Sequence, residues 1–302
     1  MGKIKKGDMV VRKSYNKDIV FRVSKISGKN GSVIATLKGV IERVEADSNI
    51  YDLEKVDKNT LKNKMKEVEK NFKNRIEKIL GGNKEKRKQE LNGEKEVRYN
   101  FESSQVISGT ILHLDGDKRY SQKAEKYYKK IGLNAVVRNI AEYRQPQMIY
   151  RLLKTYNPDI LIITGHDAML KRNVDLYNIY NYKNSKYFVE TVIQTRKYDQ
   201  ENNTRTVIFA GACQSYFEAL ISAGANFASS PARILIDFLD PIIVAEKIAL
   251  TEIDKYVTID DIVYELRDGK KGVNGIGARG KMRIKYMWMY GKYIENRRIR
   301  FN

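Results

Sequence analysis

Cysteine and histidine are the scarcest reactive residue types in this chain of 302 residues. Cys213 is the only cysteine, and His113 and His166 are the two histidines. A cysteine attacks carbonyl carbon atoms as the thiolate, and a nearby histidine can take the thiol proton and later protonate a leaving amine. One cysteine excludes an intrachain disulfide and a zinc site built on several cysteines. These residue types therefore point to acyl transfer by a cysteine–histidine pair, without a metal or cofactor.

Cys213 and His166 each follow a short apolar run, residues 206–210 and 159–164 respectively. Nearly continuous apolar runs of this length predict buried strands of a parallel sheet, and such sheets bind ligands beyond the carboxyl ends of their strands. The two residues lie 47 positions apart, which suits a crossover between neighbouring strands. We expect them side by side at one sheet edge, with Cys213 as nucleophile and His166 as acid and base.

Taken alone, each of the two residues has an ordinary structural interpretation. A lone cysteine after a buried strand is most often a packing residue. Their joint occurrence, each directly after a strand and behind small residues, favours the dyad. The backbone N–H groups of Asp167 and Cys213 are candidate oxyanion donors. A helix is expected over about 214–221, and its N-terminus would favour a thiolate at Cys213. His113 lies within an apolar strand and is expected in the core or at its edge.

The elements that must position these residues alternate between strand and helix from about residue 104. Such alternation predicts an α/β domain over 104–302 with a parallel sheet covered on both faces. The expected strands are 106–114, 134–137, 159–164, 206–210 and 234–239, and the expected helices are 119–131, 142–156 and 186–197.

The first 55 residues have a different pattern. Four β-branched runs separated by Gly and Asn turn signals predict strands at 8–12, 19–23, 32–37 and 40–44. Short strands at this spacing suggest a small SH3-like β-barrel. Residues 56–103 form a charged helical connector with apolar residues at helical spacing. Its apolar face either packs on the next domain or forms a partner-binding coiled coil.

The net charge of +20 comes from 57 Lys and Arg against 37 Asp and Glu. This balance favours anionic partners, although a solvated lysine-rich surface explains it equally well. The N-terminal barrel shares the excess and is a candidate for docking to an anionic surface. No run approaches the roughly 18–20 apolar residues of a membrane span, and the N-terminus lacks a signal peptide. We therefore expect a cytoplasmic protein with no membrane span.

The pattern of a histidine after one apolar strand and an Ala-Cys pair after the next resembles the caspase, legumain, gingipain and separase group. Three motifs, residues 112–117, 163–167 and 210–215, together with the basic N-terminal barrel, more closely resemble the YabG family of sporulation-specific cysteine proteases. In the caspase, legumain, gingipain and separase group a glycine usually follows the histidine, whereas Asp167 follows His166 here. The resemblance implies a caspase-like parallel-sheet sandwich preceded by the barrel. It also implies an endopeptidase of the sporulating cell, associated with the spore coat, that cleaves spore-coat and cortex-processing proteins after arginine.

In the caspase-like group, the residue that reads the side chain before the scissile bond often follows the first strand. Asp115 and Asp117 occupy that place, and a carboxylate can receive an arginine side chain in bidentate fashion. Asp237 and Asp240, after the expected strand 234–239, are second candidates. The Asp-Gly-Asp sequence also suits an ordinary tight turn, or a metal or phosphate site as in receiver domains. A receiver would leave His166 and Cys213 unexplained.

Other functions also fit parts of the sequence. The basic charge, the barrel and the tyrosines suit a nucleic-acid-binding protein with a non-catalytic α/β domain, whose binding would weaken with salt and survive loss of Cys213. A coat-associated structural protein with an inert thiol is a third interpretation. The glycine-rich residues 275–280 do not follow a clear strand and open a clear helix, so we discount a phosphate loop there. The basic residues 297–300 are a candidate self-cleavage target.

Overall fold

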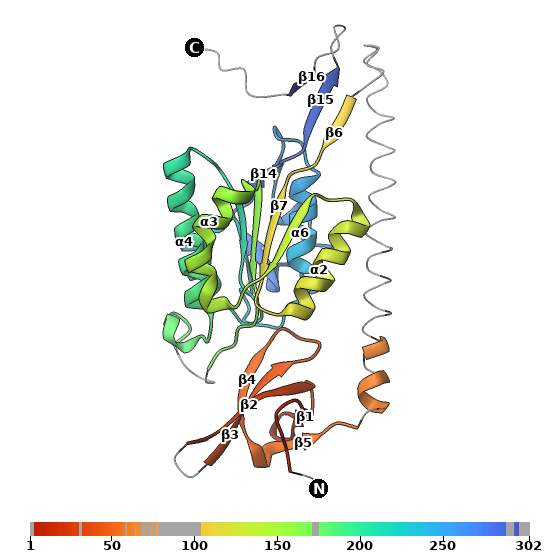
Figure 1. Ribbon diagram of the computed structural model, residues 1–302, viewed down its shortest axis with the longest axis vertical. Helices are drawn as coiled ribbons and strands as arrows, with labels where there is room; N and C mark the ends of the chain where they lie inside the picture. The colour runs from red at the N-terminus through yellow and green to blue at the C-terminus, as the bar shows by residue number, and fades with distance from the viewer. Residues whose placement is uncertain are drawn as a thin grey trace.

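The computed structural model (Figure 1) has an N-terminal sheet module and a larger α/β domain. The structure describes residues 3–29, 32–57, 59–63, 65–67, 70, 74, 77, 104–170, 175–287 and 293–295. No helix in these ranges is both long and apolar enough to cross a membrane.

The α/β domain is built on a six-stranded mixed sheet. Its order is β13-β11-β10-β9-β7-β8, in which all strands are parallel except β13, which runs antiparallel to β11. The strands are β7 (Ile111–Asp115), β8 (Ala135–Asn139), β9 (Ile160–Thr164), β10 (Val207–Ala210), β11 (Phe227–Ser229) and β13 (Val273–Gly275). The predicted α/β class is confirmed. The caspase-like description stays a prediction.

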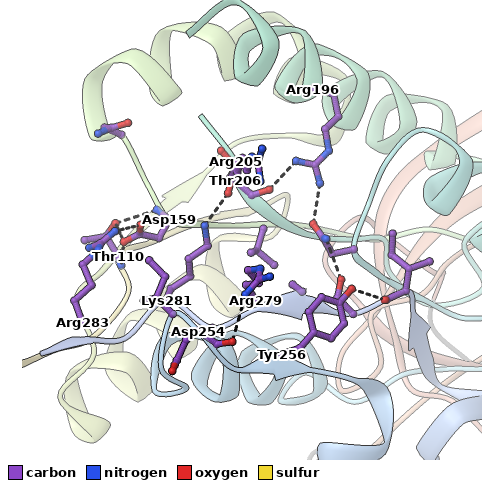
Figure 2. A pocket seen from close by; sticks show the side chains of 18 of the residues that line it. Thr110, Asp159, Arg196, Arg205, Thr206, Asp254, Tyr256, Arg279, Lys281 and Arg283 are labelled. Atoms are coloured by element: carbon purple, nitrogen blue, oxygen red, sulfur yellow. Dashed lines mark hydrogen bonds and ion pairs between the residues drawn. The ribbon is translucent and has the colours of Figure 1, made fainter. Parts of the chain in front are cut away.

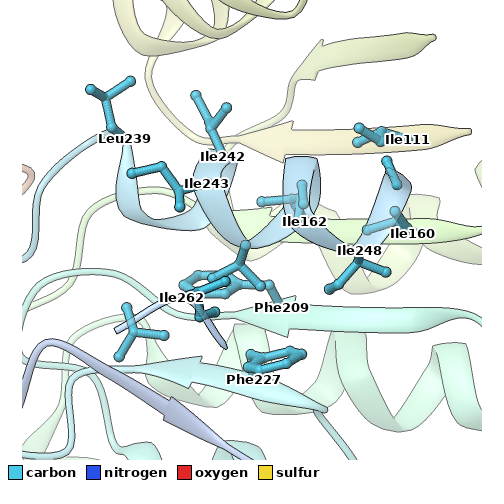
Figure 3. Packing of buried hydrophobic residues seen from close by; sticks show 14 of the residues in the cluster. Ile111, Ile160, Ile162, Phe209, Phe227, Leu239, Ile242, Ile243, Ile248 and Ile262 are labelled. Atoms are coloured by element: carbon cyan, nitrogen blue, oxygen red, sulfur yellow. The ribbon is translucent and has the colours of Figure 1, made fainter. Parts of the chain in front are cut away.

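Five helices cover the two faces of this sheet. They are α2 (Lys118–Ile131), α3 (Gln145–Tyr156), α4 (Ser185–Asn202), α5 (Phe217–Ser222) and α6 (Asp240–Ala249). Helices α2 and α6 lie on one face, and α3 and α4 lie on the other (Figure 1). Successive residues of a strand point to opposite faces, so Ile160 and Ile162 pack beneath α6 while Leu161 and Ile163 pack on the other side. Figure 3 shows Phe209 in the layer beneath α6.

Two predicted strands of the α/β domain differ in the structure. Residues 234–239 have irregular backbone, and the strand beside β10 is instead β11. The side chain of Asp237 accepts a hydrogen bond from the Leu239 N–H, and Asp240 accepts one from the Asp237 N–H. Donors that a strand ladder would need are therefore used in local turns, which is why the apolar run does not pair. The predicted strand 106–114 is broken at 108–110 into β6 and β7.

The remaining strands of the α/β domain lie in two small sheets at its far end. They are β6 (Ser104–Ile107), β12 (Tyr256–Val257), β14 (Ala278–Arg279), β15 (Arg283–Met287) and β16 (Tyr293–Glu295). Strand β15 pairs with β6 and β16, and β12 pairs with β14. Residues 275–280 run from the last residue of β13 through β14, and the next described element is β15, so no helix follows them as a phosphate loop would require. The candidate self-cleavage target at 297–300 lies outside the described residues.

The N-terminal module is a five-stranded antiparallel sheet of order β4-β3-β2-β1-β5. Its strands are β1 (Met9–Arg12), β2 (Phe21–Lys29), β3 (Ser32–Gly39), β4 (Glu45–Asn49) and β5 (Leu53–Lys55). Among the described residues, the pairings leave β4 and β5 as edges, so the closed SH3-like barrel stays a prediction. The expected strand 40–44 is wrong. A hydrogen bond of 2.9 Å from the Gly39 N–H to the Val44 carbonyl closes residues 40–43 into a hairpin loop instead.

The N-terminal module packs on the α/β domain at the carboxyl ends of the parallel strands (Figure 1). Val10, Phe21 and Val44 from the module share one buried apolar cluster with Cys213 and Ile236 from the α/β domain. The module therefore covers the sheet edge where the sequence places the chemistry.

Only part of the predicted connector is described. Leu61 packs on apolar residues of the N-terminal module, whereas Met65 is 47% exposed. The remaining apolar positions of the predicted helix face, Val68, Phe72, Ile76 and Ile79, lie outside the described residues. The boundaries 1–55, 56–103 and 104–302 stay predictions.

His113 lies in the core, as its place within an apolar strand predicted. Its ring is fully buried, with Nδ1 3.0 Å from the Tyr128 hydroxyl and Nε2 3.1 Å from Thr164 Oγ1. Burial lowers the pKa of His113 to about 3, aided by the nearby positive charge of Arg43. His113 is therefore a neutral structural residue at physiological pH.

Replacing His113 with glutamine should destabilise the protein by about 1–3 kcal/mol at pH 7, because two buried partners lose a hydrogen bond. In the wild type, a folded pKa below the unfolded value means that stability is full above about pH 6.5 and is lost as pH falls toward 3. Glutamine carries no such penalty. The difference in unfolding free energy, measured by urea denaturation from pH 7 to pH 4, should therefore shrink with falling pH. A constant difference would contradict the assignment.

Candidate active site

Three neighbouring strands deliver the predicted site residues to one edge of the sheet. Strand β7 ends at Asp115. His166 lies two residues after the end of β9, and Cys213 lies three residues after the end of β10. Ile163 of β9 pairs with Ala210 of β10, so His166 and Cys213 each lie three residues beyond the same register pair. Neighbouring strands are about 4.8 Å apart. The structure thus brings together the three strand ends that the sequence singled out.

Cys213 lies fully buried beneath the N-terminal module. Its Sγ atom is 3.8 Å from the carbonyl oxygen of Ile236. Burial raises the pKa of the thiol to about 11, against the opposite effect of the nearby positive charge of Arg43. In this arrangement the thiol is protonated at neutral pH.

The helix expected directly after Cys213 begins later. Gln214 has a left-handed backbone with φ of 57°, and α5 starts only at Phe217. The turn at Gln214 separates the thiol from the helix N-terminus, so the predicted support of a thiolate by that helix is wrong. The Ser215 side chain forms part of the turn, because its hydroxyl accepts the Ala212 N–H at 2.9 Å.

His166 lies between two carboxylates. Its Nε2 is 3.7 Å from Asp117 Oδ2, and its Nδ1 is 3.9 Å from Glu142 Oε1. Within the described part of the chain, neither ring nitrogen has a hydrogen-bond partner. Burial lowers the pKa of His166 to about 3, against the opposite effect of Asp117. The imidazole is therefore neutral, with both ring nitrogens available to accept or donate a proton once a substrate enters.

Glu142 is a site residue that the sequence analysis missed. Its Oε1 accepts the His166 backbone N–H at 2.8 Å, and burial raises the pKa of the carboxyl. A Cβ atom added at Gly116 would lie 2.1 Å from this oxygen, and one at Gly165 would lie 2.4 Å from it. The two glycines therefore make room for Glu142 beside His166. Glu142 follows β8 at the same edge, so the strand-end rule applied to that strand would have found it.

The Asp167 side chain joins two loops of the site. It accepts hydrogen bonds from the hydroxyls of Ser185 and Ser215 and, at 2.7 Å, from the Asn184 N–H. Burial raises the pKa of this carboxyl to about 6, and those hydrogen bonds oppose the rise. The carboxylate thus has a structural role in holding the loop after β9 against the loop after β10. An oxyanion role for the Asp167 or Cys213 N–H stays a proposal.

Asp115 and Asp117 are neighbouring buried carboxylates, called the acidic pocket below. The Asp115 carboxylate accepts hydrogen bonds from Thr164 Oγ1 at 3.0 Å and from the Asp117 N–H at 2.8 Å. It also accepts one at 3.0 Å from Nη1 of Arg43, which enters from the N-terminal module and is 1% exposed. Asp117 bonds the Arg119 N–H at 2.8 Å and begins helix α2. The pair of carboxylates therefore already receives arginine side chains.

Asp237 and Asp240 have local structural roles. The Asp240 carboxylate, at the start of α6, accepts hydrogen bonds from the Asp237 N–H and, at 3.1 Å, from the Arg267 N–H. Among the described residues, no cluster of three or more His, Cys, Asp or Glu side chains is arranged to hold a metal ion. Of the four candidate residues, Asp115 contacts an arginine side chain of the N-terminal module, whereas Asp117 pairs with Arg119 two residues along the chain.

A cavity of about 1300 Å³ lies at the opposite edge of the sheet (Figure 2). Its lining includes the residues that directly precede β7, β9 and β10, namely Thr110, Asp159 and Thr206. Two of its cationic side chains form ion pairs within the protein: Arg283 with Asp159, and Arg196 with Asp199 at 2.8 Å. The cavity is distinct from the candidate active site.

Comparison with known proteins identifies relatives of this chain. Residues 5–287 match the family model described as YabG peptidase U57. The sporulation-specific protease YabG of Bacillus subtilis (strain 168) is 40% identical over 280 residues, which cover 92% of this chain and 96% of the relative.

Solved structures give weaker similarities. The receiver domain of the Francisella response regulator 1452 has 18% identity and a TM-score of 0.26, covering 40% of this chain and 82% of that domain. A receiver-domain mutant of the Arabidopsis thaliana histidine kinase CKI1 has 14% identity and a TM-score of 0.27, covering 41% of this chain and 86% of that domain. At these TM-scores neither similarity says anything about fold or function.

Proposed function

The chain belongs to the YabG peptidase U57 family, and from that premise we propose that it is a cysteine endopeptidase that cleaves proteins after arginine. Cys213 is the nucleophile and His166 the acid and base. The observation that carries the proposal is the equivalent position of these two residues beyond adjacent parallel strands, next to an acidic pocket that already holds an arginine.

The reaction follows from the positions of these side chains. His166 takes the thiol proton as Cys213 attacks the carbonyl carbon of the arginine residue, and the resulting imidazolium protonates the leaving amine. Water then hydrolyses the thioester. Asp117 and Glu142 flank the two ring nitrogens and stabilise the imidazolium, since a carboxylate near a histidine favours its charged form. The Asp167 and Cys213 N–H groups are the proposed oxyanion donors.

Arginine specificity is proposed to come from Asp115, with Asp117 beside it. Arg43 demonstrates that a guanidinium reaches the Asp115 carboxylate in this pocket. A buried carboxylate that would otherwise be unpaired discriminates strongly against neutral side chains, because leaving it desolvated and alone costs several kcal/mol.

The biological setting is proposed from the relative's name and the charge. The protease acts in the sporulating cell on spore-coat and cortex-processing proteins, in association with the coat. The basic N-terminal module, with ten Lys and Arg against two Asp in its first 40 residues, provides a docking face for an anionic surface.

Removing His166 should slow alkylation of the native thiol. Because burial raises the pKa of the Cys213 thiol to about 11, almost none of it is thiolate at pH 7, so loss of a proton-accepting partner should reduce the rate by about tenfold or more. Iodoacetamide modification followed by mass spectrometry reports on Cys213 alone, because the chain has one cysteine. Wild type and His166→Ala should react equally in denaturant. Equal rates in the native proteins would contradict the dyad.

A further inference from the structure

The hairpin loop between β3 and β4 enters the candidate active site. The loop comprises residues 40–43 and is closed by the hydrogen bond between Gly39 and Val44. It lies at the end of the N-terminal module that faces the α/β domain (Figure 1). Its last residue, Arg43, is the arginine in the acidic pocket.

The protease domain holds the backbone of this loop on both sides of its tip. Arg119 Nη2 donates to the Gly39 carbonyl at 3.3 Å, and the Tyr120 hydroxyl donates to the Ile41 carbonyl. Val44 forms a parallel β-bridge with Asp167, the residue after His166. Backbone pairing of this kind is how extended peptides are bound at sheet edges and loops.

The bond between Arg43 and Val44 lies next to the proposed catalytic groups. Val44 lies in the same buried apolar cluster as Cys213 and is bridged to Asp167, the residue after His166. The side chain of Arg43 contacts Asp115 at the end of the neighbouring strand β7. The peptide bond between Arg43 and Val44 therefore lies among the strand ends that carry the nucleophile and the acid and base.

The pairing of Arg43 is incomplete. Of its guanidinium nitrogens, Nη1 contacts Asp115, whereas Nε and Nη2 are buried and have no hydrogen-bond partner within the described ranges. Buried donors without a hydrogen-bond partner destabilise a folded protein. An ion pair with a purely structural role would be expected to satisfy these donors. We therefore interpret the site as one that binds arginine side chains in general, with Arg43 as one occupant.

The docked loop also closes the site to other chains. Cys213 and His166 are fully buried, and the thiol is packed among apolar residues of the N-terminal module. A second polypeptide cannot reach the thiol while Arg43 fills the pocket. The protease in this arrangement has its own chain as its bound substrate.

We propose that residues 39–44 are an internal substrate, and that Cys213 cleaves the bond between Arg43 and Val44. The inference rests on the proposed function. The Cys213 sulfur forms a bond to the Arg43 carbonyl carbon, His166 transfers the thiol proton to the Val44 nitrogen, and the C–N bond breaks. Water then hydrolyses the thioester, which leaves a carboxylate on Arg43, an amine on Val44 and the thiol restored.

The cut chain would stay assembled at first. Residues before the cut remain paired with residues after it through β1–β5 and β3–β4, so the two fragments share one sheet. The product is a nicked protein whose fragments separate only in denaturant. The cut also leaves a negative main-chain carboxylate on Arg43 near the carboxylates of the site, and charge repulsion then favours release of the loop, which opens the site to external substrates.

The test follows the purified full-length chain by intact mass in denaturant over time. The wild type should give two fragments that end at Arg43 and begin at Val44, and whose masses sum to the intact mass plus one water. The rate should be unchanged by tenfold dilution, because the reaction is intramolecular. Cys213→Ala should remain intact. Arg43→Gln should remain intact, Arg43→Lys should be cut at least about tenfold more slowly, and Arg22→Gln, a matched arginine of β2, should be cut like wild type.

An arginine peptide assay on the same samples separates the possible failures. If the wild type cleaves peptides but its Arg43–Val44 bond survives prolonged incubation, or if the cut occurs at another residue, the internal substrate is refuted while the proposed function stands. If the wild type cleaves neither its own chain nor any peptide, the proposed function fails. Cutting of Cys213→Ala at the wild-type rate would also refute the proposal. Circular dichroism checks that each variant is folded, and native mass spectrometry checks that the two fragments of a nicked protein stay together.

Discussion

Replacing Cys213 with alanine should reduce cleavage of arginine peptides by at least about 10³–10⁴-fold, with the arginine-binding pocket left in place. The size of the loss follows from the role of a covalent nucleophile: without it, only substrate binding and oxyanion stabilisation remain. Cys213 is buried in an apolar cluster, so alanine removes a sulfur atom from a site that tolerates an apolar side chain. The variant should fold. In an Arg43→Gln background, where Arg43 does not fill the site of either protein, kcat measured with fluorogenic peptides should carry most of the loss.

The control for this result is a serine variant. Cys213→Ser keeps a nucleophilic atom at the same place, but the hydroxyl is far less easily deprotonated than a thiol. It should be nearly as inactive as Cys213→Ala. Activity within about tenfold of wild type in either variant would show that another residue attacks the peptide.

Replacing Asp115 with asparagine should remove the preference for arginine. The side chain keeps its shape and loses its charge, so the buried guanidinium of a substrate loses its ionic partner. Truncating or neutralising one member of a buried charge pair costs about 2–5 kcal/mol, which corresponds to about 30- to 5000-fold in kcat/KM. Peptides with citrulline, the neutral analogue of arginine, should be affected much less. The measured quantity is the ratio of kcat/KM for the two peptides.

Two further variants make this measurement decisive. Asp115→Asn also leaves Arg43 unpaired, so the experiment is repeated in an Arg43→Gln background, where no internal guanidinium is buried. Asp237→Asn is the matched control from the second pair of candidate residues, and it should leave the ratio unchanged. A ratio that falls in Asp237→Asn and not in Asp115→Asn would assign arginine recognition to the other acidic pair.

Much of the site was predictable from the sequence because parallel sheets impose a simple geometry. Apolar runs mark the strands, and the residues that follow them, Asp115, His166 and Cys213, must gather at one edge. The run at 234–239 was equally apolar but did not form a strand, since Asp237 and Asp240 use backbone donors in local turns. Composition alone does not distinguish these two outcomes.

The contribution of the N-terminal module to the site was not predictable. Residues 40–44 have the composition of a strand, yet 40–43 form the loop that carries Arg43 into the acidic pocket. That contact joins residues 72 positions apart and depends on how the two parts of the chain pack. Local periodicity carries no information on such packing. The delayed start of α5, at Phe217, reflects the turn at Gln214, which the sequence also did not indicate.

The most direct measurement is affinity labelling with a peptidyl-arginine chloromethyl ketone, followed by peptide mapping of the modified residue. The nicked wild type and the Arg43→Gln variant are used, because the first is cut after Arg43 and the second has no arginine at position 43 to fill the pocket. The account predicts one label, on Cys213, which inactivates the enzyme and forms much more slowly with the citrulline analogue and in His166→Ala. Inactivation with the label on any residue other than Cys213, or with no dependence on the arginine side chain, would contradict it.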